Sequence, residues 1–168
     1  MNTPGRTITT EEALREREFA LAVAQRMARL GSWALDLSNL DDVDSNTLWW
    51  SDQCYRLFGY EPGTVEVTNE LFFHHVHPED RPAISAAVAR AIREHTPYSL
   101  EHRIILPDGS ERVVHEWAEV LTNASGRPVR LVGAIQDITE RKRTEEALRK
   151  ALVRRARARS CSREPSTT

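Results

Sequence analysis

The stretch that decides the fold runs from Leu106-Pro107-Asp108-Gly109-Ser110, through Gly126-Arg127-Pro128, to Asp137-Ile138-Thr139-Glu140-Arg141. Proline, aspartate and glycine favour turns, so the first two groups predict the turns that join three successive strands. The third group marks an abrupt change from a strand to a charged helix. Because a strand that continues into an exposed helix can transmit a signal, this arrangement favours a sensor over a catalyst.

Alternating side chains support strands on either side of these turns. One face of the first strand holds Tyr98, Leu100, His102 and Ile104. The second strand alternates Val113, His115 and Trp117 with Val114, Glu116 and Ala118. The third alternates Val129, Leu131, Gly133 and Ile135 with Val132 and Ala134. Apolar residues on both faces predict that both are covered, one by helices from the middle of the chain and the other by an N-terminal helix or a second subunit.

The N-terminal segment predicts a helix. Thr9 and Glu12 have the spacing of a capping box, and apolar residues then recur every three to four positions. The predicted helix is amphipathic and runs from about Thr10 to Arg29. Short strands around residues 33–37 and 48–50 follow it.

The middle of the chain predicts helices. Ser51 can cap a short helix, and His77-Pro78-Glu79-Asp80 places proline and acids where a helix begins. The longer helix should end near His95. The predicted fold class is α+β, with a five-stranded antiparallel sheet, helices inserted between strands 2 and 3, an N-terminal amphipathic helix and a C-terminal signalling helix.

Length and composition limit the alternatives. The chain has 168 residues, of which 40% are hydrophobic and 29% charged, which is typical of one soluble globular domain with extensions. No apolar run approaches the ~20 residues of a membrane span, and no secretory signal is visible, so a cytoplasmic location is expected. Two cysteines, Cys54 and Cys161, argue against a disulfide framework.

The expected domain boundaries follow the changes in pattern. Residues 1–29 form the N-terminal flanking helix, 30–138 the domain, 139–153 the exit helix and 154–168 a basic disordered tail. The tail is rich in arginine and could attract nucleic acid or anionic lipid, but a solvated terminus is the favoured interpretation and nucleic-acid binding is not expected.

A family resemblance rests on a series of short motifs. They are Leu30-Gly31-Ser32-Trp33, Trp50-Ser51-Asp52, Leu57-Phe58-Gly59-Tyr60, Val76-His77-Pro78-Glu79-Asp80-Arg81, Glu101-His102-Arg103-Ile104, Asp108-Gly109-Ser110 and Asp137-Ile138-Thr139. In this order and spacing the chain resembles the PAS sensor family, with a PAC segment over about 98–138, as found at the input end of sensor histidine kinases and diguanylate cyclases. The resemblance covers about Arg29 to Leu148.

The resemblance implies a sheet that cups a small cavity against the middle helices. It also implies that Asp137, Ile138 and Thr139 form the junction through which the domain acts on the following helix. From the residues alone, the Thr139 hydroxyl can cap that helix and Asp137 can pair with a nearby basic group, although Asp137 could equally be a solvent-exposed strand end. If a ligand fills the cavity, the candidate lining residues are His102, Trp117 and Leu131. For His102, a core histidine bonded to a neighbour is the favoured alternative.

No cofactor is assigned. Flavin is disfavoured because Cys54 lies in Asp52-Gln53-Cys54-Tyr55-Arg56 and not in the segment that light-oxygen-voltage proteins use. Haem is disfavoured because His77 belongs to a helix start. The histidines lack partners at metal-ligand spacing, so no metal site is predicted.

No enzyme motif is found. Only 29 residues follow Thr139, without a histidine, a glycine-rich nucleotide loop or a Gly-Gly-Asp-Glu-Phe segment. The expected function is a cytoplasmic sensory module that responds to a small molecule or a partner. It would form a homodimer through its flanking helices, with Leu148 and Leu152 on one helix face, and would act on an unidentified output protein or domain. The alternatives are a ligand-free interaction module and the input fragment of a sensor histidine kinase.

Overall fold

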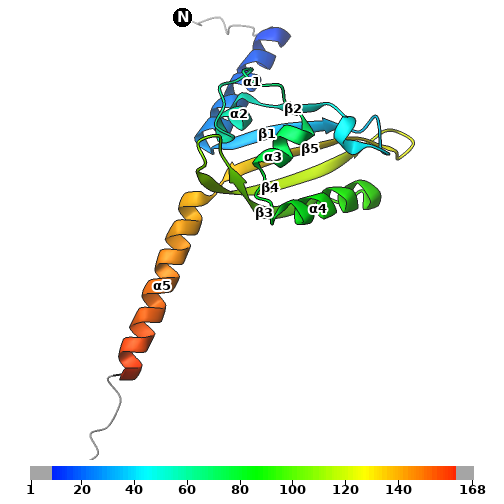
Figure 1. Cartoon of the computed structure of the whole chain (residues 1–168). Helices are drawn as coiled ribbons and strands as arrows, with labels where there is room; N and C mark the ends of the chain where they lie inside the picture. The colour runs from blue at the N-terminus through cyan, green and yellow to red at the C-terminus, as the bar shows by residue number, and fades with distance from the viewer. Residues whose placement is uncertain (1–8, 162–168) are drawn as a thin grey trace, which may run out of the picture.

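Five antiparallel strands form one sheet in the order β2-β1-β5-β4-β3 (Figure 1). The computed structural model describes residues 9–161. Its elements, in chain order, are α1 (Thr10–Met27), β1 (Leu30–Asp36), the 3-10 helix η1 (Val43–Ser45), β2 (Leu48–Trp50), α2 (Asp52–Leu57), α3 (Asn69–His75), α4 (Arg81–Glu94), β3 (Tyr98–Ile105), β4 (Glu111–Thr122), β5 (Pro128–Asp137) and α5 (Thr139–Cys161). The predicted α+β class and the insertion of helices between the second and third strands are confirmed.

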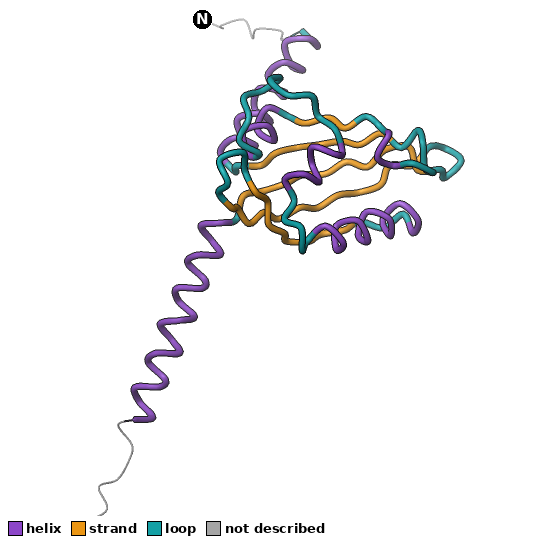
Figure 2. Tube along the Cα trace, viewed as in Figure 1, coloured by secondary structure: helices purple, strands orange, loops and turns teal. Residues whose placement is uncertain are grey.

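The helices of the middle segment cover one face of the sheet, which is the inner face (Figures 1 and 2). The buried apolar side chains of the sheet that point toward them include Trp33, Leu35, Ile104, Val114, Ala118, Leu131 and Ile135. From the helices, Cys54, Leu57 and Ala91 complete this core. The hydrophobic effect of burying these side chains holds the helices on the sheet.

Both predicted hairpin turns are present. In the first, the Ser110 carbonyl accepts the Leu106 N–H, and Gly109 has a φ of 81°. In the second, the Arg127 carbonyl accepts the Asn123 N–H, and Gly126 has a φ of 77°. Glycine adopts this left-handed conformation without the clash that a Cβ causes, which is why both turns can be tight.

Helix α1 begins with the predicted capping box. The Thr9 N–H donates to Glu12 Oε2 at 2.9 Å, and the Glu12 N–H donates to Thr9 Oγ1 at 3.2 Å. The C-terminal end of α1 is tied to the sheet, because Gln25 donates to the Ser32 hydroxyl and Gln136 donates to the Ala28 carbonyl. The rest of α1 extends beyond the sheet (Figure 1). Of the helix predicted to cover the second face, only the C-terminal end therefore contacts the sheet.

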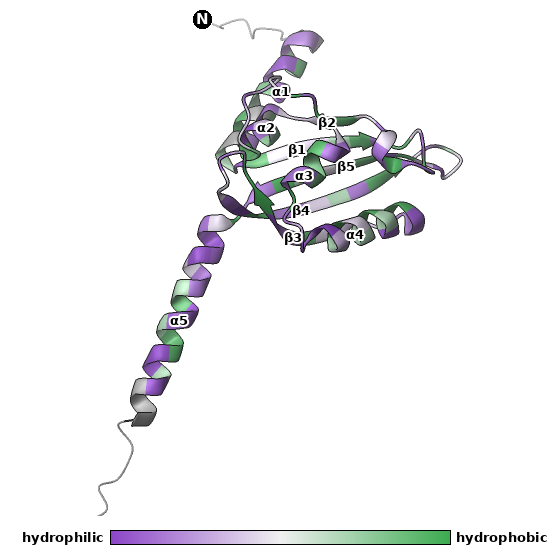
Figure 3. Ribbon diagram, in the orientation of Figure 1, coloured by the Kyte–Doolittle hydropathy of each residue, from purple (hydrophilic) through white to green (hydrophobic). Residues whose placement is uncertain are grey.

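Helix α5 is longer than predicted and projects away from the sheet (Figure 1). The predicted helix ends at residue 153 and is followed by a disordered tail from 154, whereas the structure continues the helix to Cys161. Alanine and arginine, which have high helix propensity, supply most of this extension. The ribbon of α5 is coloured mainly hydrophilic, with a hydrophobic stretch near its middle (Figure 3). The last part of the predicted tail, 162–168, lies outside the described residues.

None of the helices in the described part of the chain has the length and apolar character needed to cross a membrane.

Candidate functional site

A cavity of about 210 Å³ lies between the inner face of the sheet and the covering helices. Six aromatic residues line it: Trp33, Trp50, Phe58, Phe72, Phe73 and Tyr98. The polar residues of the lining are Asp44, Asn69, Ser85 and Glu116. Mostly apolar walls with a few converging polar groups are typical of small-molecule sites.

Packing of the aromatic rings defines the shape of the walls. The rings of Trp50 and Phe58 stack with their centroids 4.4 Å apart and an angle of 10° between their planes. Trp33 lies over Gly133, where an added Cβ would come within 2.6 Å of the indole ring and of the Trp117 carbonyl oxygen. Glycine at 133 therefore allows the ring of Trp33 to lie against β5.

Glu116 is a buried carboxylate on the cavity wall. Its residue exposure is 2%, and its two oxygens have different partners: the Tyr98 hydroxyl donates to Oε1 at 3.0 Å and His102 Nε2 lies 2.9 Å from Oε2. Burial raises the pKa of the Tyr98 hydroxyl, and the adjacent Glu116 charge raises it further. The same two causes, burial first, raise the pKa of the Cys54 thiol. Both groups therefore remain protonated at neutral pH.

The three predicted cavity residues have different positions. Leu131 is fully buried and lines the cavity. His102 is buried on the inner face and bonded to Glu116, which matches the favoured alternative for it, but it is not part of the lining. Trp117 does not line the cavity, because β4 turns its even-numbered residues inward and Trp117 lies on the outer face beside His115. The expectation for Trp117 is corrected: Glu116 takes the inward position next to it.

The predicted junction links β5, β4 and α5. Asp137 Oδ1 accepts the Thr139 N–H at 2.9 Å and the Thr139 hydroxyl at 2.6 Å. The Thr139 oxygen in turn accepts the Val113 N–H at 3.0 Å. Asp137 thus caps the start of α5, whereas the Thr139 hydroxyl, expected to be the cap, ties the helix to β4. Ile138 is buried between them, with 5% exposure.

Arg112 connects this junction to α2. Its Nε lies 3.6 Å from Asp137 Oδ2, and its Nη1 donates to the Leu57 carbonyl at 2.8 Å. Asp137 is therefore paired with a basic group and is not a free strand end. Since Leu57 ends the same helix that places Cys54 on the cavity wall, a continuous set of polar contacts runs from the cavity helix to α5.

The first turns of α5 are also tied to the domain by charges. Arg141 Nη2 lies 2.8 Å from Glu101 Oε1, and Lys142 pairs with the same carboxylate. The hydrogen bond from Lys142 is the main cause that lowers the pKa of Glu101. Arg29 forms a longer ion pair with Glu140, at 3.5 Å, which links the connection between α1 and β1 to the start of α5.

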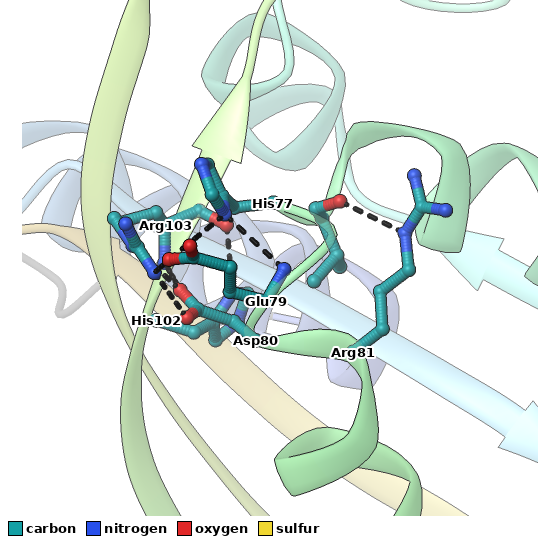
Figure 4. A network of polar contacts seen from close by, with 7 residues as sticks. His77, Glu79, Asp80, Arg81, His102 and Arg103 are labelled. Carbon is teal, nitrogen blue, oxygen red and sulfur yellow. Dashed lines mark hydrogen bonds and ion pairs between the residues drawn. The ribbon is translucent and has the colours of Figure 1, made fainter.

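The His77-Pro78-Glu79-Asp80 segment, just before α4, is bonded to β3 through Arg103 (Figure 4). Asp80 accepts hydrogen bonds from the Arg103 N–H and from its guanidinium, at 2.6 to 3.0 Å, and Glu79 accepts from the same guanidinium at 2.8 Å. These bonds to Arg103 lower the pKa of Asp80. The Asp80 side chain makes no cap bond to the helix, so its role here is to hold β3.

Across the described residues, no group of three or more histidine, cysteine or acidic side chains is arranged to hold a metal ion.

The geometry defines a class of protein: an α+β domain with a ligand-sized cavity and a helix that leaves from the end of its last strand. Residues 47–135, just over half of the chain, match the family model described as the PAS fold. The chain therefore belongs to the PAS family of sensor domains, which occur in signal-transduction proteins.

Two curated proteins illustrate the relationship. A probable diguanylate cyclase of Escherichia coli is 27% identical over 143 residues, which cover 85% of this chain and 12% of that protein. A blue-light-activated histidine kinase of Brucella ovis is 29% identical over 150 residues, which cover 89% of this chain and 28% of the kinase. The chain thus spans less than a third of either relative, and no catalytic domain is evident in the matched region.

Solved structures support the same assignment. A sensory box histidine kinase/response regulator from Burkholderia thailandensis matches with a TM-score of 0.64 and 27% identity, over 82% of this chain and 98% of that one. An RNA-binding light-oxygen-voltage receptor matches with a TM-score of 0.60 and 28% identity, over 79% of this chain and 35% of the receptor.

Proposed function

We propose that this domain senses a small molecule in its cavity and transmits the occupied state through Asp137, Ile138 and Thr139 to α5. The observation that supports this proposal best is the polar path from α2 through Arg112 to Asp137. A ligand that displaces α2 changes the position of the Leu57 carbonyl, and Arg112 couples that carbonyl to the cap of α5. The cytoplasmic location expected from the sequence belongs to the same proposal.

The output is a histidine kinase or a diguanylate cyclase, in the same chain or in a partner. The names of the relatives support this part, since a histidine kinase and a probable cyclase both contain a region similar to this chain. The domain itself supplies regulation and not catalysis. In either output, α5 is the element that the signal reaches.

A homodimer joined by the flanking helices completes the proposal. Helix α1 exposes Phe19 and Met27 to 72% and 81%, and α5 exposes Leu148 and Leu152 to 61% and 57%. Apolar side chains this exposed along two helices are typical of surfaces that another chain covers. On α5, Leu148 and Leu152 lie one turn apart, as in a helix pair.

Native mass spectrometry of the protein purified from its source organism tests the sensing part. The expected result is a species heavier than the chain by the mass of a small molecule, which is lost on denaturation. A visible absorption spectrum of the same sample tests the expectation against flavin and haem. Protein that carries no added mass would favour the ligand-free interaction module instead.

Regulation can be tested in a chimera that joins residues 1–153 to a histidine kinase output. Replacing Asp137 by Ala should uncouple kinase activity from the domain while leaving the kinase active. If the variant chimera is regulated like the parent, the junction does not transmit the signal.

A further inference from the structure

Glu116 presents a fixed hydrogen-bond acceptor to the cavity. Tyr98 and His102 hold its two oxygens in place from the neighbouring strand, at 3.0 and 2.9 Å. A carboxylate has roughly four lone-pair sites, so each oxygen can accept a further bond. Because the side chain is nearly out of solvent, a donor on a ligand would meet it with little competition from water.

The charges of the lining have one sign. Among the described residues that line the cavity, the ionisable acids are Asp44 and Glu116, and none is lysine, arginine or histidine. An anionic group placed here would lose its water without gaining a cation, which is costly. The lining therefore selects against phosphates and carboxylates and tolerates a cation.

Trp33 lines the cavity with its indole ring, and its residue exposure is 8%. Its Nε1 is buried and has no hydrogen-bond partner within residues 9–161. Because this nitrogen is closed off even from water, the ring and not its N–H is the part of Trp33 that a ligand meets.

Size and wall chemistry limit the ligand further. An apolar cavity of about 150 Å³ can hold benzene, so about 210 Å³ suits one ring or two fused rings. The six aromatic residues of the wall favour a planar ring, which can stack or meet them edge-on.

We infer that the cavity binds a small planar nitrogen heterocycle, uncharged or cationic, which donates an N–H to Glu116. The inference rests on the proposed sensing function and specifies the chemical class of the signal. Glu116 acts as the specificity-determining residue, with Tyr98 and His102 as its positioning residues.

A matched set of probes tests the inference on the wild-type protein. Benzimidazole has a donor and an acceptor, 1-methylbenzimidazole lacks the donor, and benzoate is an anion of similar size. Titration followed by protein-observed NMR should give an affinity for benzimidazole about tenfold or more above that for the methylated probe, as expected for a hydrogen bond to a charged group. Benzoate should not bind. The indole N–H signal of Trp33, assigned with Trp33→Phe, should shift when benzimidazole binds.

A pair of variants then assigns the selectivity to one residue. Glu116→Gln keeps the shape of the side chain and one acceptor oxygen, so it should fold while reducing the preference for benzimidazole over its methylated form. Glu119→Gln changes an exposed acid on the outer face of the same strand and should leave the preference unchanged. If Glu116→Gln does not fold, the probe series on the wild-type protein still tests the inferred ligand class.

The outcomes separate this inference from the sensing function. Equal binding of both benzimidazoles, or binding of benzoate, would overturn the inferred ligand class and leave a sensing cavity. Failure of all three probes, together with a bound molecule of another class in native mass spectrometry, would also overturn only the ligand class. Failure of all probes with no bound molecule in purified protein would overturn both.

Discussion

The guanidinium of Arg112 lies 3.6 Å from the carboxylate of Asp137, at the point where the last strand becomes α5. Asp137 caps α5 through the Thr139 N–H, and Arg112 donates to the carbonyl at the end of α2. Both side chains are partly shielded from solvent, with 33% and 21% exposure, so their interaction is screened less than an ordinary surface pair.

Replacing Arg112 by Met should therefore lower the free energy of unfolding by about 1 kcal/mol, because Asp137 loses its cation and the Leu57 carbonyl loses its donor. Urea unfolding of the purified domain measures this. Arg130→Met is the matched control, since Arg130 pairs with Asp36 at 3.1 Å but with both side chains about half exposed. If Arg130→Met lowers the free energy of unfolding as much as Arg112→Met does, the pair of Arg112 and Asp137 has no special role.

Replacing Gly133 by Ala should be among the more damaging small changes in the sheet. The added Cβ would meet the Trp33 ring and the Trp117 carbonyl oxygen, each at 2.6 Å. The carbonyl oxygen belongs to the backbone of β4 and cannot move away easily. A loss of about 1 to 3 kcal/mol is expected from this overpacking. Gly63→Ala provides a comparison, because Gly63 has open space around its Cβ position and only a positive φ of 76° to oppose the change. A milder effect at 133 than at 63 in thermal unfolding would contradict the packing described for Trp33.

Stability should fall on mild acidification because of His75. The Tyr60 hydroxyl lies 2.8 Å from Nε2, and Nδ1 lies 2.6 Å from the Ile105 carbonyl, an arrangement that suits the neutral ring with a proton on Nδ1. Burial lowers the pKa of His75 from the ordinary value of 6.5. The unfolded chain therefore binds more protons below that pH, so the stabilisation is present above about pH 6.5 and is lost as the pH falls toward the folded-state pKa.

Urea unfolding at pH 7.5 and 5.5 measures this dependence. His75→Gln should be less stable at pH 7.5 and should lose less on acidification than the wild type. The contribution of Asp80, whose pKa is lowered by Arg103, is lost at lower pH, below the ordinary carboxyl range, and so does not confuse the comparison. An identical loss between the two pH values in wild type and variant would exclude His75 as the source.

Dimerisation should depend on the apolar residues of α5. Changing both Leu148 and Leu152 to Lys places charges on the proposed helix pair and should shift the protein toward monomer in analytical ultracentrifugation, by about tenfold or more in dissociation constant. Arg154→Lys on the same helix keeps the charge and should have no effect. A double variant that dimerises as tightly as the wild type would assign the interface to another surface.

The sequence predicted much of the sheet because its local signals agree with the tertiary structure. Asp108-Gly109 and Asn123 to Gly126 are turn formers between alternating strands, and the structure has turns at both places. The capping box of Thr9 and Glu12 is local in the same way, since its bonds lie within one turn of helix.

The error at Trp117 has a simple physical origin. Alternation divides β4 into two sets of residues but does not say which set points inward. Glu116 resembles a solvent-facing acid until the register is known. With Leu100 opposite Glu116, the diagonal neighbours Tyr98 and His102 both reach its carboxylate. Strand register depends on the whole sheet, so this cluster could not be read from one strand.

The partner of Asp137 was only partly predictable. A basic group near the junction was expected, but Arg112 is 25 positions away in the chain and reaches Asp137 because β4 and β5 pair there. The length of α5 was underestimated, since arginine-rich sequence is typical both of helices and of unstructured tails.

The most direct test of the central claim is the amide NMR signal of Thr139 with the cavity filled by benzimidazole, measured in the wild type and in Arg112→Met. Transmission through the junction predicts that filling the cavity shifts the Thr139 signal in the wild type and shifts it much less in the variant, although both bind the probe. A Thr139 signal that does not respond to the filled cavity, or that responds equally in both proteins, would contradict the proposed route.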